Sequence, residues 1–338
     1  MKVLILGANG FIGSHLSEAI LATKKDWQID AMDLSDDKIG DCLQNERFHF
    51  VKGDITLQKD WISEHIQSCD VVLPLVAIAT PAMYVQDPLR VFELDFEANL
   101  EIIRQCVKYK KRIIFPSTSE VYGMCPDSEF DEETSYLVTG PINKERWIYS
   151  TSKQLLDRLI FAYGKHKGLS YSLFRPFNWY GPRLDNVMNP KPGGSRVLTQ
   201  FIGNILRGEN INLVNGGSQQ RCFTYIGDGI DALIRIIENK DNSAHNRIFN
   251  IGNPLENVSI RSLAESMVQL ISDNYPKYAA MAQKVQLVDI DAKKYYGEGY
   301  QDVELRVPAI RHASKYLDWK PQVDMQVGLR KTLDFYLN

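Results

Sequence analysis

The first half of the chain alternates short apolar runs with stretches of helical periodicity. The apolar runs lie at residues 2–6, 28–32, 48–51, 70–76, 112–115 and 171–175. Helical patterns occur at residues 14–21, 91–108 and 146–160. Runs without polar alternation are typical of strands covered on both faces, and strands separated by helices form parallel sheets. The pattern therefore predicts an α/β fold built on a Rossmann-type doubly wound parallel sheet.

This alternation weakens near residue 180. Glycine and proline become more frequent beyond it, notably at residues 190–194, and short strands mix with helices. We expect a Rossmann domain over residues 1–180 and a smaller α/β domain over residues 181–338. One segment of the second domain is expected to return to the sheet.

Three glycines, Gly7, Gly10 and Gly13, separate the first predicted strand from the first predicted helix. In this context backbone N–H groups and the helix dipole bind a dinucleotide pyrophosphate, although the spacing departs from the G-x-G-x-x-G fingerprint. The second strand leads to Asp33, whose carboxylate can accept hydrogen bonds from the adenosine ribose. Because Asp36 follows and no arginine adjoins, a 2′-phosphate would meet like charge, and NAD is preferred over NADP.

The next strand ends supply further candidates. Asp54 and Ile55 follow the third strand, where the carboxylate would lie near the adenine; a plain turn residue is an equal alternative. Ala77 follows the fourth strand, at the edge where doubly wound sheets bind ligands. Tyr84 lies beyond it in an expected loop. The predicted cofactor-binding residues are Gly7, Gly10, Phe11, Ile12, Gly13, Asp33, Asp54, Ile55, Ala77, Tyr149 and Lys153.

Tyr149 and Lys153 stand at i and i+4 of a predicted helix, so an ammonium should lie beside a phenol. A free phenol titrates near ~10, and a neighbouring cation favours the phenolate. We therefore expect a lowered pKa for Tyr149, which could take a proton from a substrate hydroxyl. The spacing alone also occurs by chance. Thr118 and Ser119, at the end of the fifth strand, could orient the substrate alcohol.

The composition limits the kinds of partner that we expect this protein to bind. With 44% apolar and 24% charged residues the chain is an ordinary globular protein, and its net charge of -3 argues against nucleic acid as a partner. Its five cysteines are scattered without a C-x-x-C pair, so neither a disulfide framework nor a metal site is indicated. No apolar run is long enough for a signal peptide or a membrane span, and we expect a cytoplasmic protein without membrane contact.

Taken together, Gly7, Gly10, Gly13 with Asp33, Ser119 and the Tyr149–Lys153 pair resemble the extended short-chain dehydrogenase/reductase family of nucleotide-sugar enzymes. Longer motifs resemble the UDP-glucuronate decarboxylase domain of the ArnA enzymes. These motifs lie at residues 75–81, 115–124, 174–179 and 299–304. The resemblance implies NAD-dependent oxidation and decarboxylation of UDP-glucuronate to a UDP-4-keto-pentose, with release of carbon dioxide and NADH.

The same resemblance assigns individual residues. Tyr149 and Ser119 would serve the oxidation, and Glu120 and Arg306 the decarboxylation. Lys153 would hold the nicotinamide ribose. We expect an electrostatic role for Arg306, because guanidinium stays protonated at physiological pH. The family's substrate-binding positions match Ala79, Tyr84, Thr118, Ser119, Arg146, Asn178, Arg221 and Tyr300.

Several alternatives stay open. A UDP-xylose synthase uses the same residues but returns the hydride to the ketone before release. Sugar 4,6-dehydratases carry Asp-Glu where this chain has Ser119-Glu120, and the missing acid disfavours dehydration. An NAD-sensing protein on this fold would commonly lack the tyrosine or lysine, and both are present here. Asn212 replaces a basic residue of ArnA, and the ArnA formyltransferase domain is not present in this sequence. Relatives commonly dimerise through two helices, which predicts a homodimer formed by residues 91–108 and 149–163.

Overall fold

The computed structural model describes residues 1–188, 196–301, 303 and 305–338. Its centre is a seven-stranded sheet in which each neighbouring pair is parallel. The order β11-β6-β5-β4-β1-β2-β3 is made by β1 (Lys2–Leu6), β2 (Gln28–Asp33), β3 (Phe48–Lys52), β4 (Val71–Pro74), β5 (Arg112–Pro116), β6 (Tyr171–Pro176) and β11 (Arg247–Ile251). The predicted Rossmann-type fold is confirmed. The proline-rich segment at 190–194, and Asp302 and Glu304 of the last motif, lie outside the described residues.

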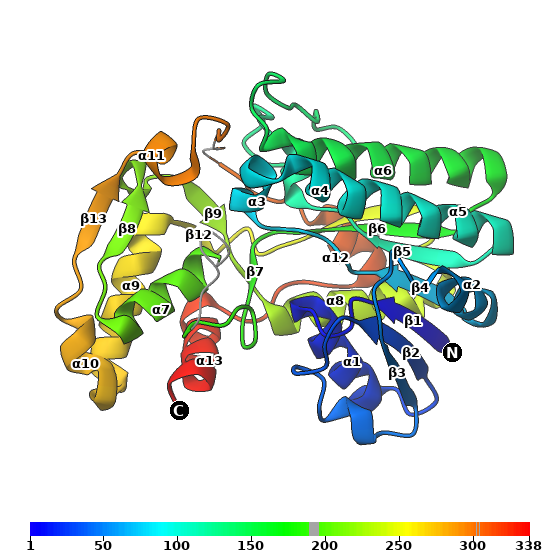
Figure 1. The fold of residues 1–338 in the computed structure, drawn as a ribbon, viewed down its shortest axis with the longest axis horizontal. Coiled ribbons are helices and arrows are strands. Elements are labelled where there is room, and N and C mark those ends of the chain that lie inside the picture. The colour runs from blue at the N-terminus through cyan, green and yellow to red at the C-terminus, as the bar shows by residue number, and fades with distance from the viewer. Residues whose placement is uncertain (189–195, 302, 304) are drawn as a thin grey trace.

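Helices cover both faces of the sheet, which explains why its strands are apolar throughout (Figure 1). Successive side chains of a strand point to opposite faces. Val3 and Ile5 of β1 accordingly pack in one hydrophobic core, and Leu4 and Leu6 pack in another. The first core is closed by α1 (Phe11–Thr23), α8 (Ile226–Glu238) and α12 (Arg311–Leu317). The second is closed by α2 (Lys59–Ser68), α5 (Asn99–Tyr109) and α6 (Trp147–Lys167).

The remaining elements gather beside the sheet, at the left of Figure 1, around a third core. Three two-stranded sheets pair β7 with β10, β9 with β12 and β8 with β13. These strands are β7 (Trp179–Tyr180), β8 (Ile211–Val214), β9 (Gln220–Cys222), β10 (Thr224–Tyr225), β12 (Asn257–Ser259) and β13 (Leu287–Ile290). The helices are α7 (Val197–Arg207), α9 (Ile260–Asn274), α10 (Pro276–Ala282), α11 (Ala292–Tyr296) and α13 (Met325–Leu337). Strand β11, from within residues 181–338, completes the large sheet. The domain division at residue 180 stays a proposal.

Two expected elements differ in the structure. The helix expected at 91–108 is divided into α4 (Pro88–Phe92), a π-helical turn η2 (Glu93–Ala98) and α5. The wider turn follows from Asn99, whose amide donates to the carbonyl oxygens of Leu94 and Asp95. Tyr84 lies in a short helix, α3 (Pro81–Gln86), and not in a loop, because Pro81 fits the first helical turn. Short 3₁₀ turns at Cys42–Gln44, Ser119–Tyr122, Asn215–Gly217 and Lys240–Asn242 complete the elements.

Within the described ranges, none of the helices combines the length and the apolarity that a membrane crossing requires. The five cysteines are buried free thiols. Over the same residues there is no group of three or more His, Cys, Asp or Glu side chains arranged to hold a metal ion.

Candidate active site

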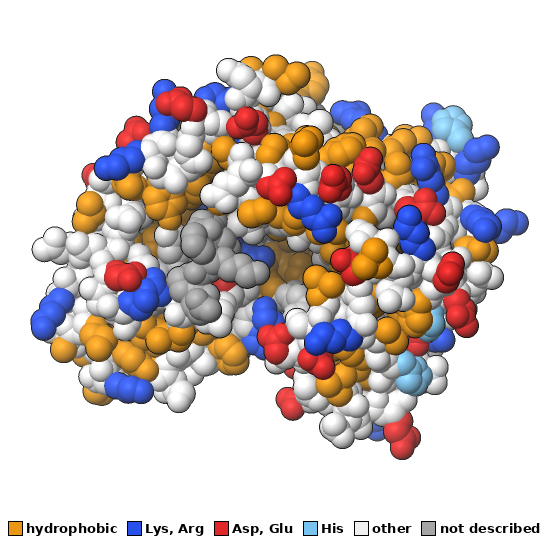
Figure 2. Space-filling model, in the orientation of Figure 1, with side chains coloured by type: hydrophobic (Ala, Val, Ile, Leu, Met, Phe, Trp, Pro, Cys, Tyr) orange, Lys and Arg blue, Asp and Glu red, His pale blue; other side chains and the backbone are white. Residues whose placement is uncertain are grey.

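A cavity of about 490 Å³ lies between the carboxyl ends of the sheet strands and the second group of elements. Figure 2 shows the surface hollowed at this place. The residues predicted from the sequence that line it are Phe11, Ile12, Ala79, Tyr84, Thr118, Ser119, Glu120, Arg146, Tyr149, Asn178, Arg221, Tyr300 and Arg306. Gly7, Gly10, Gly13, Asp33, Asp54, Ile55, Ala77 and Lys153 are not among its lining residues. The structure therefore gathers the predicted substrate residues, with the predicted oxidation residues, round one space.

Tyr149 and Lys153 both lie in the first two turns of α6, and both are buried. The Tyr149 ring stacks on Tyr84, with the ring centroids 4.7 Å apart and the planes at 7°. The Thr118 side chain lies near its hydroxyl and favours the phenolate. The Lys153 Nζ donates to the carbonyl oxygen of Pro116 at 3.1 Å, at the end of β5. Tyr149 thus faces the cavity, while Lys153 lies behind it against the sheet.

The electrostatic setting of Tyr149 differs from the expectation. Burial raises the pKa of Tyr149 far above its usual value, and the negative charges of Asp95 and Glu120 raise it further. The Thr118 side chain opposes this rise only in part. Burial also lowers the pKa of Lys153, because a charged ammonium is costly to desolvate. The prediction of a lowered phenol pKa is therefore wrong for the chain by itself.

Glu120 is the centre of a buried ion cluster. It follows β5 in the turn Ser119–Tyr122, where the Thr118 side chain accepts a hydrogen bond from the Glu120 N–H. Its carboxylate oxygens lie 2.8 Å from an Arg146 nitrogen and 3.3 Å from an Arg306 nitrogen. Burial works to raise the pKa of Glu120, but Arg146, Arg306 and Arg221 outweigh it and hold that pKa below its usual value. Glu120 is therefore ionised and is not a proton donor at neutral pH.

The two arginines of the cluster bind different oxygens of Glu120. Arg146 directly precedes α6, donates to the Gln301 carbonyl oxygen at 2.8 Å and lies over the Trp147 ring. Only 1% of its side chain is exposed, against 7% for Arg306. Two guanidiniums are bound to one carboxylate, so Glu120, Arg146 and Arg306 together carry one positive charge at the cavity.

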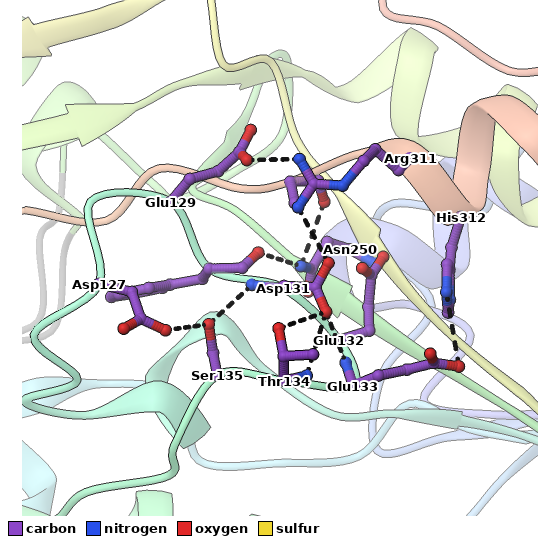
Figure 3. A network of polar contacts seen from close by, with 12 residues as sticks. Asp127, Glu129, Asp131, Glu132, Glu133, Thr134, Ser135, Asn250, Arg311 and His312 are labelled. Carbon is purple, nitrogen blue, oxygen red and sulfur yellow. Dashed lines mark hydrogen bonds and ion pairs between the residues drawn. The ribbon is translucent and has the colours of Figure 1, made fainter.

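Arg306 owes its position to backbone pairing just beyond it. The Phe130 N–H donates to the Val307 carbonyl oxygen at 2.7 Å, and the Ala309 N–H donates to the Phe130 carbonyl oxygen at 2.8 Å. Figure 3 shows the polar network that surrounds this pairing. Its members include Asp131, whose carboxylate binds Arg311 at 3.0 Å, and Asn250, whose amide donates to the Phe130 carbonyl oxygen at 2.8 Å.

The glycine turn has the shape needed to hold a dinucleotide pyrophosphate. Gly7 has φ +93°, a conformation that favours glycine. A Cβ at Gly13 would overlap the Gly7 carbonyl oxygen and lie 2.8 Å from the Ala8 Cα. Asp33 accepts one hydrogen bond on each oxygen, from Asn9 and Leu34 N–H groups at 2.8 and 2.7 Å. Each oxygen keeps acceptor capacity for a ribose hydroxyl.

The contacts of the other cofactor candidates point less clearly to a cofactor site. The Asp54 carboxylate accepts hydrogen bonds from the backbone and hydroxyl of Thr56, which lower its pKa, as a turn residue would. Ile55 is buried in the core beside α2 and α5, and Ala77 is half-buried after β4. Of the predicted substrate residues, Asn178, at φ +40°, donates its amide to the Cys222 carbonyl oxygen at 2.9 Å.

Sequence reasoning missed cavity residues on the side of the third core. Arg196 binds Asp185 at 2.6 Å, and Arg207 binds Glu209 at 2.8 Å. These arginines flank α7, and their position at both ends of one amphipathic helix was the available signal. Arg221 is buried and donates to the Gln220 carbonyl oxygen at 2.8 Å. Asn212, which we singled out as a departure, lines the same cavity.

Comparisons with known proteins agree with this geometry. Residues 3–252 match the family described as "NAD dependent epimerase/dehydratase family". The PbgP3 protein from Burkholderia pseudomallei is 54% identical, with 99% of this chain and 96% of that chain covered and a TM-score of 0.90. The UDP-glucuronic acid 4-epimerase from Bacillus cereus, solved with UDP-glucuronic acid and NAD, is 26% identical, with 99% and 98% covered and a TM-score of 0.80.

A more distant structure shows only that the fold is shared. The dTDP-glucose 4,6-dehydratase from Bacillus anthracis, solved with NAD, is 20% identical, with 99% of this chain and 96% of that chain covered and a TM-score of 0.78. The family match extends from β1 to the end of β11, across the glycine turn, the Tyr149–Lys153 pair and the whole large sheet. The chain therefore belongs to the NAD-dependent epimerase/dehydratase family, within the extended short-chain dehydrogenases/reductases, and its cofactor is NAD.

Proposed function

We propose that this enzyme oxidises and decarboxylates UDP-glucuronate to a UDP-4-keto-pentose, with NAD as the oxidant. The observation that carries the proposal is the buried cluster of Arg146, Glu120 and Arg306, which opens on the same cavity as Thr118 and Tyr149. A cluster with a surplus cation beside a candidate base suits a substrate that has a carboxylate next to the hydroxyl to be oxidised. The Bacillus cereus epimerase, solved with UDP-glucuronic acid, supports this class of substrate.

The charge of the cavity supports an anionic nucleotide sugar. Among the described residues that line it, five are arginines and one, Glu120, is a carboxylate. Arg196 and Arg207 are already paired with Asp185 and Glu209. The diphosphate and the carboxylate of UDP-glucuronate would therefore meet Arg146, Arg221 and Arg306. We assign Arg221 to the diphosphate, because the guanidinium fork can bind two phosphate oxygens together. Ala79, Tyr84, Asn178 and Tyr300 would complete the substrate contacts.

In the oxidation, Tyr149 would take the proton of the C4 hydroxyl while Thr118 and Ser119 hold its oxygen. The cofactor supplies the hydride acceptor, and its positive nicotinamide charge, with Lys153, would favour the phenolate that burial disfavours. Gly7, Gly10, Phe11, Ile12, Gly13 and Asp33 would hold the dinucleotide, with Asp54, Ile55 and Ala77 at its edge. Asp33 would bind the adenosine ribose.

Decarboxylation would follow from the position of the new ketone. A ketone at C4 is β to the C5 carboxylate, so the C5–carboxyl bond can break and leave its electrons in an enolate. Arg306, which stays protonated, would steady first the carboxylate and then the enolate. Glu120 would position Arg306 and Arg146. The proton that C5 gains balances the proton that left the C4 hydroxyl, so the reaction as a whole releases no proton.

Product analysis tests this proposal. Incubation with UDP-glucuronate and NAD should give a product lighter by carbon dioxide and two hydrogen atoms, with one NADH formed per product. A product lighter by carbon dioxide alone, without NADH, would indicate a UDP-xylose synthase. An unchanged mass with a changed sugar would indicate a 4-epimerase. Either result would overturn the proposed function. The Bacillus cereus relative favours the 4-epimerase as the second candidate.

Two variants sharpen the test. Tyr149→Phe should bind NAD and form no product, because only the candidate base is lost. Arg306→Gln should still form NADH on mixing but lose carbon dioxide at least tenfold more slowly. Arg235→Gln, a matched change of a surface arginine on α8 that pairs with Asp231, should behave as the wild type. Carbon dioxide release at the wild-type rate from Arg306→Gln would remove that residue from the decarboxylation.

A further inference from the structure

The carboxyl group of Asp95 is buried close to Tyr149, the candidate base. Asp95 belongs to the π-helical turn η2, on the apolar stripe that includes Val91, Ile102 and Cys106. The relative exposure of Asp95 is 0%. A fully buried Asp is rare unless it is paired, so its partners should explain why it is there.

Only one of the two Asp95 oxygens has a hydrogen-bond donor. Oδ1 accepts the Ile78 N–H at 2.7 Å. Within the described part of the chain, Oδ2 has no hydrogen-bond partner although it is buried. One turn further, the Asn99 amide donates to the Val76 carbonyl oxygen at 3.3 Å. The wide turn thus fixes the segment 76–78, which leads to Ala79 in the cavity wall.

The charges around Asp95 identify its partner. Lys153 is buried, and Asp95 and Asp157 are the two carboxylates that favour its charged form. Asp157 is already engaged, because one of its oxygens accepts from Ser117 at 2.7 Å and from Arg175 at 3.1 Å. Arg175 therefore takes up the charge of Asp157. Asp95 and Lys153 are not in direct ion-pair contact, but the turn η2 packs against α6 and buries both groups, so Asp95 is left to balance Lys153 at longer range.

We propose that Asp95 is a positioning residue of the oxidation site: its carboxylate is the buried counter-ion of the Lys153 ammonium, and its hydrogen bond to Ile78 fixes the adjoining wall of the cavity. This inference rests on the proposed oxidation at Tyr149. The carboxylate group as a whole supplies the negative charge, and its Oδ1 accepts the structural hydrogen bond. The two roles can be separated, since asparagine keeps an acceptor oxygen and loses the charge.

Asp95 should therefore help to set the pH range over which the oxidation proceeds. The titratable and charged groups facing Asp95 are Lys153 and Tyr149 from α6, Tyr84 from α3, and Asp157 beyond Lys153. Burial raises the pKa of Asp95 to about 6, and Lys153 opposes that rise, so the carboxylate is charged at neutral pH. Its charge raises the pKa of Tyr149 and favours the charged form of Lys153. Removing the charge should lower both pKa values.

The test compares Asp95→Asn with Glu97→Gln, which removes one carboxylate from an exposed position of the same turn. The tyrosinate absorbance of Tyr149 is titrated in the NAD complex, with Tyr149→Phe subtracted as the blank. In parallel, the pH profile of NADH formation from UDP-glucuronate is recorded. We expect the tyrosinate midpoint and both limbs of the rate profile to move down by about one pH unit in Asp95→Asn only.

Three outcomes would overturn the inference: a tyrosinate midpoint unchanged in Asp95→Asn, a midpoint that rises, or an equal shift in Glu97→Gln. A slower rate with unmoved limbs would mean that Asp95 is only structural. If circular dichroism shows that the asparagine variant does not fold, Asp95→Ser offers a smaller acceptor for the Ile78 N–H, and the same criteria apply. Failure of the wild type to use UDP-glucuronate would refute the proposed function and leave the tyrosinate comparison valid.

Discussion

Replacing Glu120 by glutamine should destabilise the protein and increase the stabilisation that an anionic ligand gives to the folded state. The change keeps the shape of the side chain but leaves Arg146 and Arg306 without their shared carboxylate. Breaking a buried ion pair from one side costs about 3–5 kcal/mol, because the other charge stays buried and uncompensated. Arg146 keeps the Gln301 carbonyl oxygen and the Trp147 ring, so we expect the lower end, about 3 kcal/mol.

The assay is urea unfolding at neutral pH, with and without UDP. Glu129→Gln is the matched control, because Glu129 pairs with Arg311 at the surface, where 63% of the arginine side chain is exposed. That change should cost less than about 1 kcal/mol. UDP binds only the folded cavity, and its negative charge can replace part of the charge that Glu120→Gln removes. UDP should therefore raise the urea midpoint of Glu120→Gln more than that of the wild type.

The pKa shift of Glu120 fixes the sign of a second observation. Because the pKa of Glu120 is lowered in the folded protein, its contribution to stability is present above its unfolded pKa and is lost as the pH falls through the folded one. The stability difference between wild type and Glu120→Gln should therefore shrink in acid. A difference below about 1 kcal/mol at neutral pH, or one that does not change with pH, would refute the buried cluster as the source of stability.

Three further predictions concern other parts of the fold. Gly13→Ala should abolish NAD binding by calorimetry and destabilise the fold by about 1–3 kcal/mol, whereas Gly40→Ala, which meets nothing within 4 Å, should do neither. Hydrogen bonds and Arg311 outweigh the effect of burial and lower the pKa of Asp131 to about 2. Asp131→Asn should therefore lower the free energy of unfolding, measured in urea, by about 1–2 kcal/mol above pH ~4, and by progressively less toward pH ~2. Phe161→Glu on α6 should dissociate the expected homodimer in light scattering, unlike Phe335→Glu on α13, which is about equally exposed.

The sequence predicted the fold well because local patterns determine it. Each apolar run expected in the first half of the chain became a strand of the large sheet, and the glycines of the turn lie where strand β1 passes into α1. The π-helical turn could not be predicted in this way, since it depends on side-chain bonds from Asn99 to the backbone. Asp95 did leave a signal, as an acidic residue on the apolar stripe of an amphipathic pattern, and that signal was missed.

The electrostatic prediction for Tyr149 failed for a different reason. The i and i+4 spacing correctly placed Tyr149 and Lys153 close together in α6, but spacing says nothing about burial. Burial raises the pKa of Tyr149 and lowers that of Lys153, and for both groups its effect is larger than that of any neighbouring charge. The effect of the lysine depends on the charge that surrounds the pair.

The same reasoning explains why the ion cluster was accessible only through a family resemblance. Arg146 and Arg306 lie 26 and 186 residues from Glu120 along the chain, so no local pattern connects them. A buried arginine requires a compensating charge, but the sequence does not say which one. In the structure one carboxylate serves two arginines, so these three side chains together carry one positive charge at the cavity wall. A substrate carboxylate is the group that would complete the balance, and it is the group that the proposed reaction removes.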